Sequence, residues 1–278
     1  MTSRTTNLFR KLKHSKLAFA LPVTFLILFI TTLGLVSATY FFSIQKIGSE
    51  SQIIKIISAK ADFLSFNDKI LSIVWSPGSS ATLSIKDSGG LTRIQPNSNQ
   101  LQISVEAASS LHEEIFASPI GKVVYELPYS ATSQSSDFIE GDSRPIVNQT
   151  GSTQSQISIV RGTEHPEIHL SYRPVVSYSA AGLENGKQVN NIRIYVINLN
   201  SSTSIDSQGE LPLRVECLDA QLTTKSYEFS SQPPNLTITA SKEDSVGTVV
   251  IPLSSNAQGA IVNIELVVVN VAIERWIR

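Results

Sequence analysis

The sequence predicts an α+β fold in which one long N-terminal helix, first transmembrane and then amphipathic, packs on an antiparallel, β-rich, sandwich-like extracytoplasmic domain. Three observations support this prediction. An uncharged run of 29 residues lies between Lys16 and Lys46. Apolar residues then recur at helical three-four spacing as far as Trp75, and from Ala81 the apolar period changes to two, which is typical of half-buried strands.

Residues 17–45 form the predicted membrane span. A bilayer core of about 30 Å needs roughly 20 apolar residues in a helix, and this run is longer than that. The run also contains polar residues, among them Thr31, Thr32 and Thr39. They are tolerable in a span because a helical hydroxyl can donate to a backbone carbonyl one turn earlier.

Residues 1–16 form a basic leader with five of the 22 basic residues and none of the acidic ones. The positive-inside rule therefore places the N-terminus in the cytoplasm and the C-terminal domain outside the cell, as in a single-pass protein of the cell membrane. The alternative is a cleaved secretory signal, because Val36-Ser37-Ala38 has the small-residue pattern of a cleavage site. Both hypotheses export the rest of the chain.

The remainder of the chain is mildly acidic, with 17 basic residues against 23 acidic ones. This balance argues against a nucleic-acid partner, which would need a basic face. The single cysteine, Cys217, cannot form an internal disulfide. Its neighbours alternate as in a strand, so we expect a buried thiol that packs as a small apolar group.

Residues 46–76 are predicted to extend the helix amphipathically until Ser76-Pro77-Gly78 ends it. Two apolar stripes run along this extension. The first is the predicted helix-packing or assembly face and contains Ile47, Ile54, Ile57, Ala61, Leu64, Leu71 and Trp75. The second lies beside it and contains Ile53, Ile56, Phe63, Ile70 and Val74. One continuous helix of span and extension would be about 90 Å long.

Residues 77–278 are predicted to form the β-rich domain, with a possible junction near 129–156, where polar residues predominate. Residues 106–118 are compatible with a strand or a short helix. Asn185-Gly186 predicts a tight hairpin. The segment Ile261–Ile273 is apolar on both faces through its middle, which predicts a central strand in the sheet that packs on the helix.

This order of segments resembles type IV pilins and pilin-like proteins. The strands at Gly121–Glu126 and Ile192–Leu199 resemble archaeal pilin-like exported proteins more than bacterial pilins. His14-Ser15 before Lys16 is the nearest match to a pilin processing site, and the span does not begin with the acidic residue that aligns bacterial pilin subunits. The resemblance implies a surface-filament protein whose partners are the lipid bilayer, further copies of itself, or other pilin-like or envelope proteins.

No sequence motif indicates catalysis, and we predict no catalytic residue, no cofactor and no metal site. His165, Glu167 and His169 would share one face of a strand and could together hold a divalent metal. Polar alternation of this kind is, however, typical of a strand that faces solvent. We interpret His112-Glu113-Glu114 and Glu243-Asp244 as solvated groups for the same reason.

Three N-x-S/T sequons make Asn148, Asn200 and Asn235 possible glycosylation sites, although a chain rich in Ser, Thr and Asn also produces such matches by chance. Two non-enzymatic functions remain. The first is a structural subunit or accessory of a cell-surface filament. The alternative is a stand-alone tethered β-sandwich, similar to an adhesin or an anchor, that binds a cell-envelope partner or a glycan. Processing of the N-terminus next to the span would favour the first function, and an intact basic leader the second.

Overall fold

The computed structural model describes residues 5–107, 111–128, 137–150, 153–162, 165–231, 235–243 and 245–277, with side chains from residue 22 onward. The chain divides into two compact units, residues 1–54 and 55–278. Helix α1 (Thr5–Ile73) begins in the first unit and ends in the second, which contains all of the described strands. The predicted α+β class, with one long apolar N-terminal helix before a β-rich domain, is confirmed.

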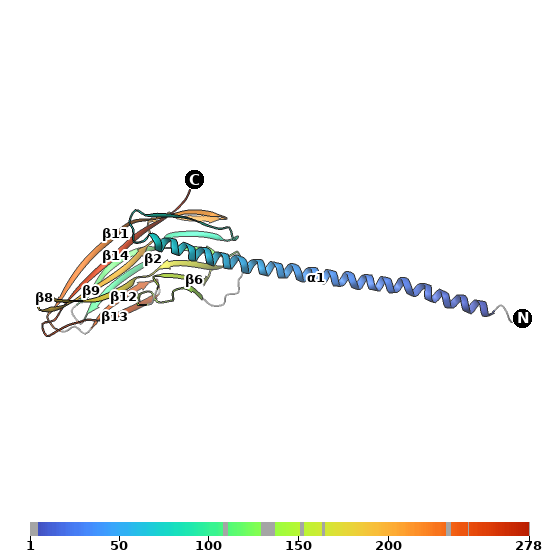
Figure 1. Ribbon diagram of the computed structural model, residues 1–278, viewed down its shortest axis with the longest axis horizontal. Helices are drawn as coiled ribbons and strands as arrows, with labels where there is room; N and C mark the ends of the chain where they lie inside the picture. Colours follow the sequence, from blue (N-terminus) through green and yellow to red (C-terminus); the bar gives the residue numbers. More distant parts are fainter. Residues whose placement is uncertain are drawn as a thin grey trace. The chain divides into compact units, whose positions relative to one another are not determined.

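Two sheets make up the β-domain (Figure 1). Sheet A has six strands in the order β1 (Ser80–Ile85), β11 (Leu211–Phe229), β14 (Ala260–Arg275), β9 (Lys187–Asn198), β8 (Val175–Glu184) and β5 (Val147–Asn148). Sheet B runs in the order β13 (Ser245–Pro252), β12 (Asn235–Lys242), β2 (Leu91–Ala107), β3 (Leu111–Glu126), β7 (Pro166–Tyr172), β6 (Ser155–Arg161) and β4 (Asp137–Glu140). Strand β10 (Ile205–Gln208) also pairs with β2.

Sheet A is mixed rather than purely antiparallel, which the sequence did not predict. Strand β14 runs parallel to β9, and β5 runs parallel to β8, while the other described pairs are antiparallel. A parallel pair needs a long crossover connection. The chain between β9 and β14 supplies one, because it passes through strands of both sheets before it returns beside β9.

Strand β14 is central, as the sequence predicts, and lies between β11 and β9. Its two faces belong to different hydrophobic cores. The first core takes its odd-numbered residues Val269, Val271 and Ile273, and the second takes its even-numbered residues Val262, Ile264 and Leu266. Successive side chains of a strand point to opposite faces, so the two cores lie on opposite sides of β14. This arrangement explains why the segment is apolar on both faces.

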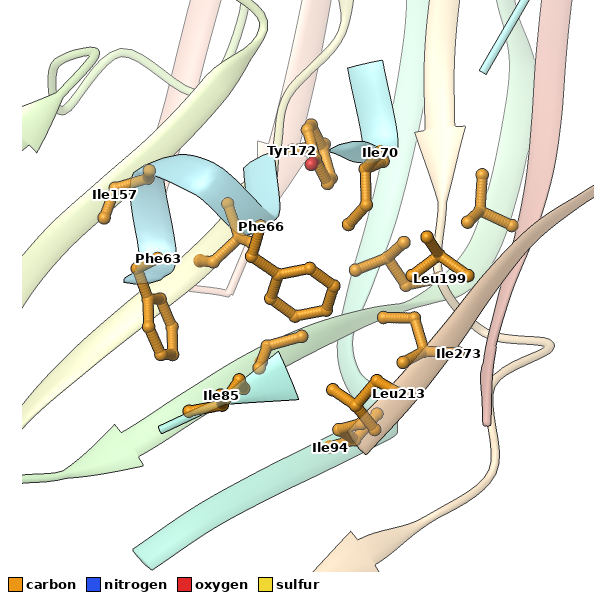
Figure 2. Close-up of a cluster of buried hydrophobic side chains, with 14 of the residues drawn as sticks. Phe63, Phe66, Ile70, Ile85, Ile94, Ile157, Tyr172, Leu199, Leu213 and Ile273 are labelled. Carbon is orange, nitrogen blue, oxygen red and sulfur yellow. The ribbon is translucent and has the colours of Figure 1, made fainter. Parts of the chain in front are cut away.

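The first core, called here the helix core, contains the buried residues of α1 and side chains from both sheets. Figure 2 shows Phe63, Phe66 and Ile70 of the helix facing strand residues such as Ile85 and Leu213. The second core, called here the sandwich core, contains side chains from both sheets and no described helix residue. The helix therefore contributes to one of the two cores only.

The two sheets approach each other closely at Gly121 in β3. A Cβ atom built at this glycine would lie 2.7 Å from the backbone oxygen of Leu199, which follows β9. The nearby side chains of β3 divide between the cores, since Ile120 belongs to the sandwich core and Val123 to the helix core. Glycine permits this backbone approach because it has no side chain.

The predicted hairpin at Asn185-Gly186 is confirmed. It joins β8 to β9, and Asn185 and Gly186 both have positive φ angles, of 51° and 80°. A two-residue hairpin of this type needs left-handed conformations at both positions, which Asn and Gly adopt at least cost. The segment 106–118, where a helix was one possibility, instead contributes to β2 and β3 in its described part.

The polar region 129–156 was predicted as a junction, and residues 129–136 and 151–152 within it lie outside the described part of the chain. The rest is held by Arg173, a fully buried guanidinium. Its Nη1 donates to Asp142 Oδ1 at 2.5 Å and to the carbonyl of Arg144 at 3.0 Å, and its Nε donates to the carbonyl of Thr153 at 3.0 Å. Hydrogen bonds from Arg144 and then Arg173 hold the pKa of the Asp142 carboxyl well below its usual range.

Candidate functional site

Within residues 22–73, helix α1 is long and apolar enough to cross a membrane, and it is the only such helix among the described residues. Its large apolar side chains from Val23 to Ile44 are about half to three-quarters exposed, with Phe25 at 74%. The threonines of this stretch behave as predicted. Thr32 and Thr39 donate to the carbonyls of Leu28 and Leu35, at 2.6 and 2.8 Å, so their hydroxyls are satisfied within the helix.

In the second unit the helix buries one narrow stripe. Its members follow three-four spacing and are Ala59, Phe63, Phe66, Asn67, Ile70, Ile73 and Val74. Phe63 meets the ring of Phe66 edge-on at 6.5 Å and tilts toward Tyr125 of β3 at 6.1 Å. From the second predicted stripe, Phe63, Ile70 and Val74 are fully buried and Ile56 is partly buried, whereas Ile53 is exposed.

The predicted packing or assembly face lies mostly outside the core of the isolated chain. Five of its seven residues are exposed, namely Ile47, Ile54, Ile57, Ala61 and Trp75. The other two, Leu64 and Leu71, are partly buried at the margin of the helix core. Trp75 leans edge-on against Tyr195 of β9 at 5.2 Å. The members in the second unit, Ile57, Ala61, Leu64, Leu71 and Trp75, are called here the outer stripe.

One polar residue, Asn67, interrupts the buried stripe, and both the oxygen and the nitrogen of its side-chain amide form hydrogen bonds. Its Oδ1 accepts from the hydroxyl of Tyr172 at 2.9 Å, and its Nδ2 donates to both carboxylate oxygens of Glu140 at 3.2 Å. Glu140 also accepts from Thr153 at 3.0 Å and from Ser155. Burial raises the pKa of Tyr172 well above its usual value, so this hydroxyl keeps its proton and remains a donor.

The end of the helix packs against Cys217 of β11. This thiol is fully buried, as predicted, and donates to the carbonyl of Val74 at 3.4 Å. Burial raises the pKa of Cys217, with a smaller contribution from Asp219. A protonated and enclosed thiol is a poor nucleophile, so Cys217 is a packing residue.

The histidine and carboxylate pattern on β7 forms a pair rather than a metal cluster. His169 Nε2 lies 2.6 Å from Glu167 Oε2, and the other oxygen of Glu167 lies 3.5 Å from Arg93. His165 is 3.9 Å from Glu126 instead. Burial lowers the pKa of His169 despite its contact with Glu167. Within the described residues no group of three or more His, Cys, Asp or Glu side chains is placed to hold a metal.

The group at residues 112–114 is more ordered than the predicted solvated patch. Glu113 accepts from Tyr227 at 2.6 Å and pairs with Lys225, both on β11, and these bonds lower its pKa. His112 pairs with Glu106 at 2.8 Å. The bonds of Glu113 to Lys225 and Tyr227 show that this end of β3 lies beside β11, which the sequence alone does not reveal.

The three sequon asparagines differ in exposure. Asn148 in β5 and Asn235 at the start of β12 are exposed. Asn200 is partly buried in a turn, where its backbone N–H donates to Asn198 at 3.0 Å and its side chain accepts from Ser201 at 3.3 Å. Two of the three sites therefore present an accessible amide.

Sequence reasoning missed a polar group on sheet B that involves Asn99, Lys122 and Lys242. The three residues come from neighbouring strands or the ends of strands, and only the strand order brings them together. Glu243 and Asp244 were interpreted as solvated groups. Glu243 follows Lys242, and Asp244 falls outside the described residues.

Compared with known proteins, the chain matches no protein-family model, no curated protein and no solved structure.

Proposed function

We propose that the chain is a non-enzymatic, single-pass membrane protein that displays its β-domain outside the cell as a pilin-like subunit or accessory of a surface filament. One observation carries the proposal. A single helix has an exposed apolar part long enough to span a membrane and a later part whose buried side chains belong to the helix core. Because the same helix would cross the membrane and contribute to the helix core, the β-domain would stay attached to the membrane.

The basic leader supports the proposed orientation. Five basic residues precede the apolar run and no acidic residue occurs before Glu50. Such an asymmetry keeps the short N-terminus in the cytoplasm. The β-domain would then lie outside the cell, where the exposed sequons at Asn148 and Asn235 would be available for glycosylation.

The outer stripe supports the assembly part of the proposal. Ile57 is 60% exposed on a helix whose opposite side is buried, and Trp75, just after the helix, is 51% exposed. Large apolar residues that gather on one exposed face mark an interaction surface more often than isolated ones do. In the proposed filament this stripe packs against the helix of another copy.

The test uses cells that express the full chain. Alkaline extraction should leave the protein in the membrane fraction, and gold labels against the β-domain should decorate filaments in electron micrographs. Labels scattered singly over the surface would contradict filament assembly and favour the tethered binding module. Release of the protein by alkali would contradict the anchor itself.

The mature N-terminus separates the two functions a second time. Mass spectrometry should find the leader removed next to the span if the chain enters a filament, because charged residues resist extraction from the membrane. An intact N-terminus with Arg4 to Lys16 would indicate a fixed anchor.

A further inference from the structure

We propose that a polar cavity on sheet B binds an anionic monosaccharide unit of the uronic acid class, with its carboxylate at Lys122 and Lys242 and a hydroxyl at Asn99. The proposal is independent of the membrane span and of filament formation. It would give the β-domain a ligand of its own in either function.

The cavity has a volume of about 310 Å³. Strands β2, β3, β6, β7 and β12 contribute to its walls, and Phe138 of β4 and Pro145 also line it. Small-molecule pockets range from about 300 to 1,000 Å³. The cavity therefore suits one small ring rather than a large cofactor or a peptide.

Asn99 provides the first indication of a ligand. Its side chain is only 8% exposed, lines the cavity, and has an oxygen, Oδ1, that accepts no hydrogen bond. Within the described part of the chain it is the only buried side-chain N or O atom without a partner. Buried polar atoms are nearly always paired, so an orphan acceptor on a residue that lines the cavity indicates a donor supplied from the cavity once the carboxamide turns toward it. A sugar hydroxyl is such a donor.

Two lysines supply the charge. Lys242 Nζ donates to Ser171 at 2.9 Å and to Gln156 at 3.2 Å, which leaves the third of its protons for a ligand. Lys122 lies close enough to lower the pKa of both Lys242 and His169. Among the described residues, neither lysine forms an ion pair.

Among the described residues, the other ionisable groups at the cavity leave a positive balance. Glu243 opposes one lysine, His169 has a pKa lowered by burial, and the nearby Arg173 is neutralised by Asp142 at 2.5 Å. Burial lowers the pKa of Lys242 to about 8, because little water remains to solvate the ammonium. A bound carboxylate would supply the missing counter-charge.

The remaining wall favours a sugar over a bare anion. Phe138 is 40% exposed and lines the cavity, so part of its apolar side chain is available to the apolar face of a sugar. The hydroxyl of Ser171 accepts from Lys242 and can still donate to a ligand. The Oε1 atom of Gln156 can still accept, whereas its Nε2 already donates to two backbone carbonyls. Such a mixture of donors, acceptors and one aromatic ring matches a polyhydroxylated ring that bears a carboxylate.

The experiment measures binding of glucuronate, glucose and acetate to the full chain in detergent micelles by titration calorimetry. Glucuronate should bind saturably and at least about tenfold more tightly than glucose or acetate. Lys122→Met and Lys242→Met should each weaken glucuronate binding by about tenfold or more, a loss of about 1.4 kcal/mol at that factor. Lys86→Met, which removes an exposed lysine elsewhere, should bind as the wild type does.

The proposal is overturned if glucose binds as tightly as glucuronate, if acetate competes equally, or if both lysine variants bind like the wild type. A thermal melt of each variant shows whether it is folded. If Lys242→Met unfolds, the glucuronate affinities of Lys122→Met and Phe138→Leu provide the test. Both side chains are partly exposed, so these variants should stay folded. Unchanged glucuronate affinity in these two variants would also overturn the proposal.

Discussion

The hydroxyl of Tyr172 in β7 donates to Oδ1 of Asn67 in α1 at 2.9 Å, inside a largely apolar contact between helix and sheet. An apolar helix face can slide along a sheet with little change in buried area. A buried polar pair resists such sliding, because any other register leaves both groups without partners. We infer that this pair fixes how far the helix enters the β-domain.

A double-mutant cycle tests this coupling. Tyr172→Phe leaves Asn67 Oδ1 unpaired and should lower the free energy of unfolding by about 1 to 3 kcal/mol. Asn67→Leu should also lower the free energy of unfolding, because it leaves the Tyr172 hydroxyl without its acceptor. The double variant should be less destabilised than the sum of the two, by about 1 kcal/mol, in urea unfolding. Strict additivity would show that the two residues act independently.

The two stripes of the helix should respond oppositely to truncation. Phe63→Ala removes a fully buried ring from the helix core and should cost about 3 to 5 kcal/mol of unfolding free energy. Ile57→Ala changes a side chain that is 60% exposed and should cost less than about 0.5 kcal/mol. Urea unfolding of the full chain in micelles provides the comparison. Equal losses in the two variants would mean that the outer stripe also belongs to the core.

The free energy of unfolding should depend on pH through Lys242. Burial lowers the pKa of this lysine to about 8 in the folded chain, below its ordinary value of 10.5. Between these values the unfolded chain binds more protons than the folded one, so stability rises with pH in this window. The rise due to Lys242 is on the order of 2 to 3 kcal/mol.

Lys242→Met provides the control for that effect. Tyr125, Tyr172 and Tyr227 have raised pKa values and destabilise the folded chain at high pH in both proteins, so the wild type should be compared with the variant at each pH. The stability difference should grow in favour of the wild type between about pH 8 and pH 10. A constant difference would show that Lys242 titrates normally.

Gly121 should be intolerant of a methyl group. Its added Cβ would lie 2.7 Å from the backbone oxygen of Leu199, so Gly121→Ala must move the sheets apart and should cost about 1 to 3 kcal/mol in thermal or urea unfolding. Gly48→Ala is the matched substitution, because nothing lies within 4 Å of its Cβ position and it is helical. It should leave the β-domain unaffected. Equal tolerance at both glycines would contradict the close approach at Gly121.

Local patterns were sufficient to predict the helix, most strand positions and the hairpin at Asn185-Gly186. Each depends on the spacing of apolar residues or on the backbone preference of a few neighbours. The sequence could not decide which stripe of the helix faces inward, because both are apolar. The stripe that is buried includes Asn67, whose partners Tyr172 and Glu140 are distant in the sequence.

The cavity could not have been found from the sequence for a similar reason. Asn99, Lys122 and Lys242 meet because β2 pairs with both β3 and β12. Periodicity identifies a strand but does not identify its neighbour. The parallel pairing of β14 with β9 was missed on the same grounds, since an apolar strand of this kind can pair in either direction.

Thiol cross-linking tests whether the outer stripe joins copies of the chain beside the membrane. Ile57→Cys and Leu183→Cys introduce thiols at residues of similar exposure, 60% and 66%, and the native Cys217 is buried and stays inert. In membranes from cells that express the full chain, a bismaleimide should link the Ile57→Cys variant into dimers and larger species while the Leu183→Cys variant stays monomeric. A monomeric Ile57→Cys variant, or equal linking at both positions, would contradict the proposed assembly.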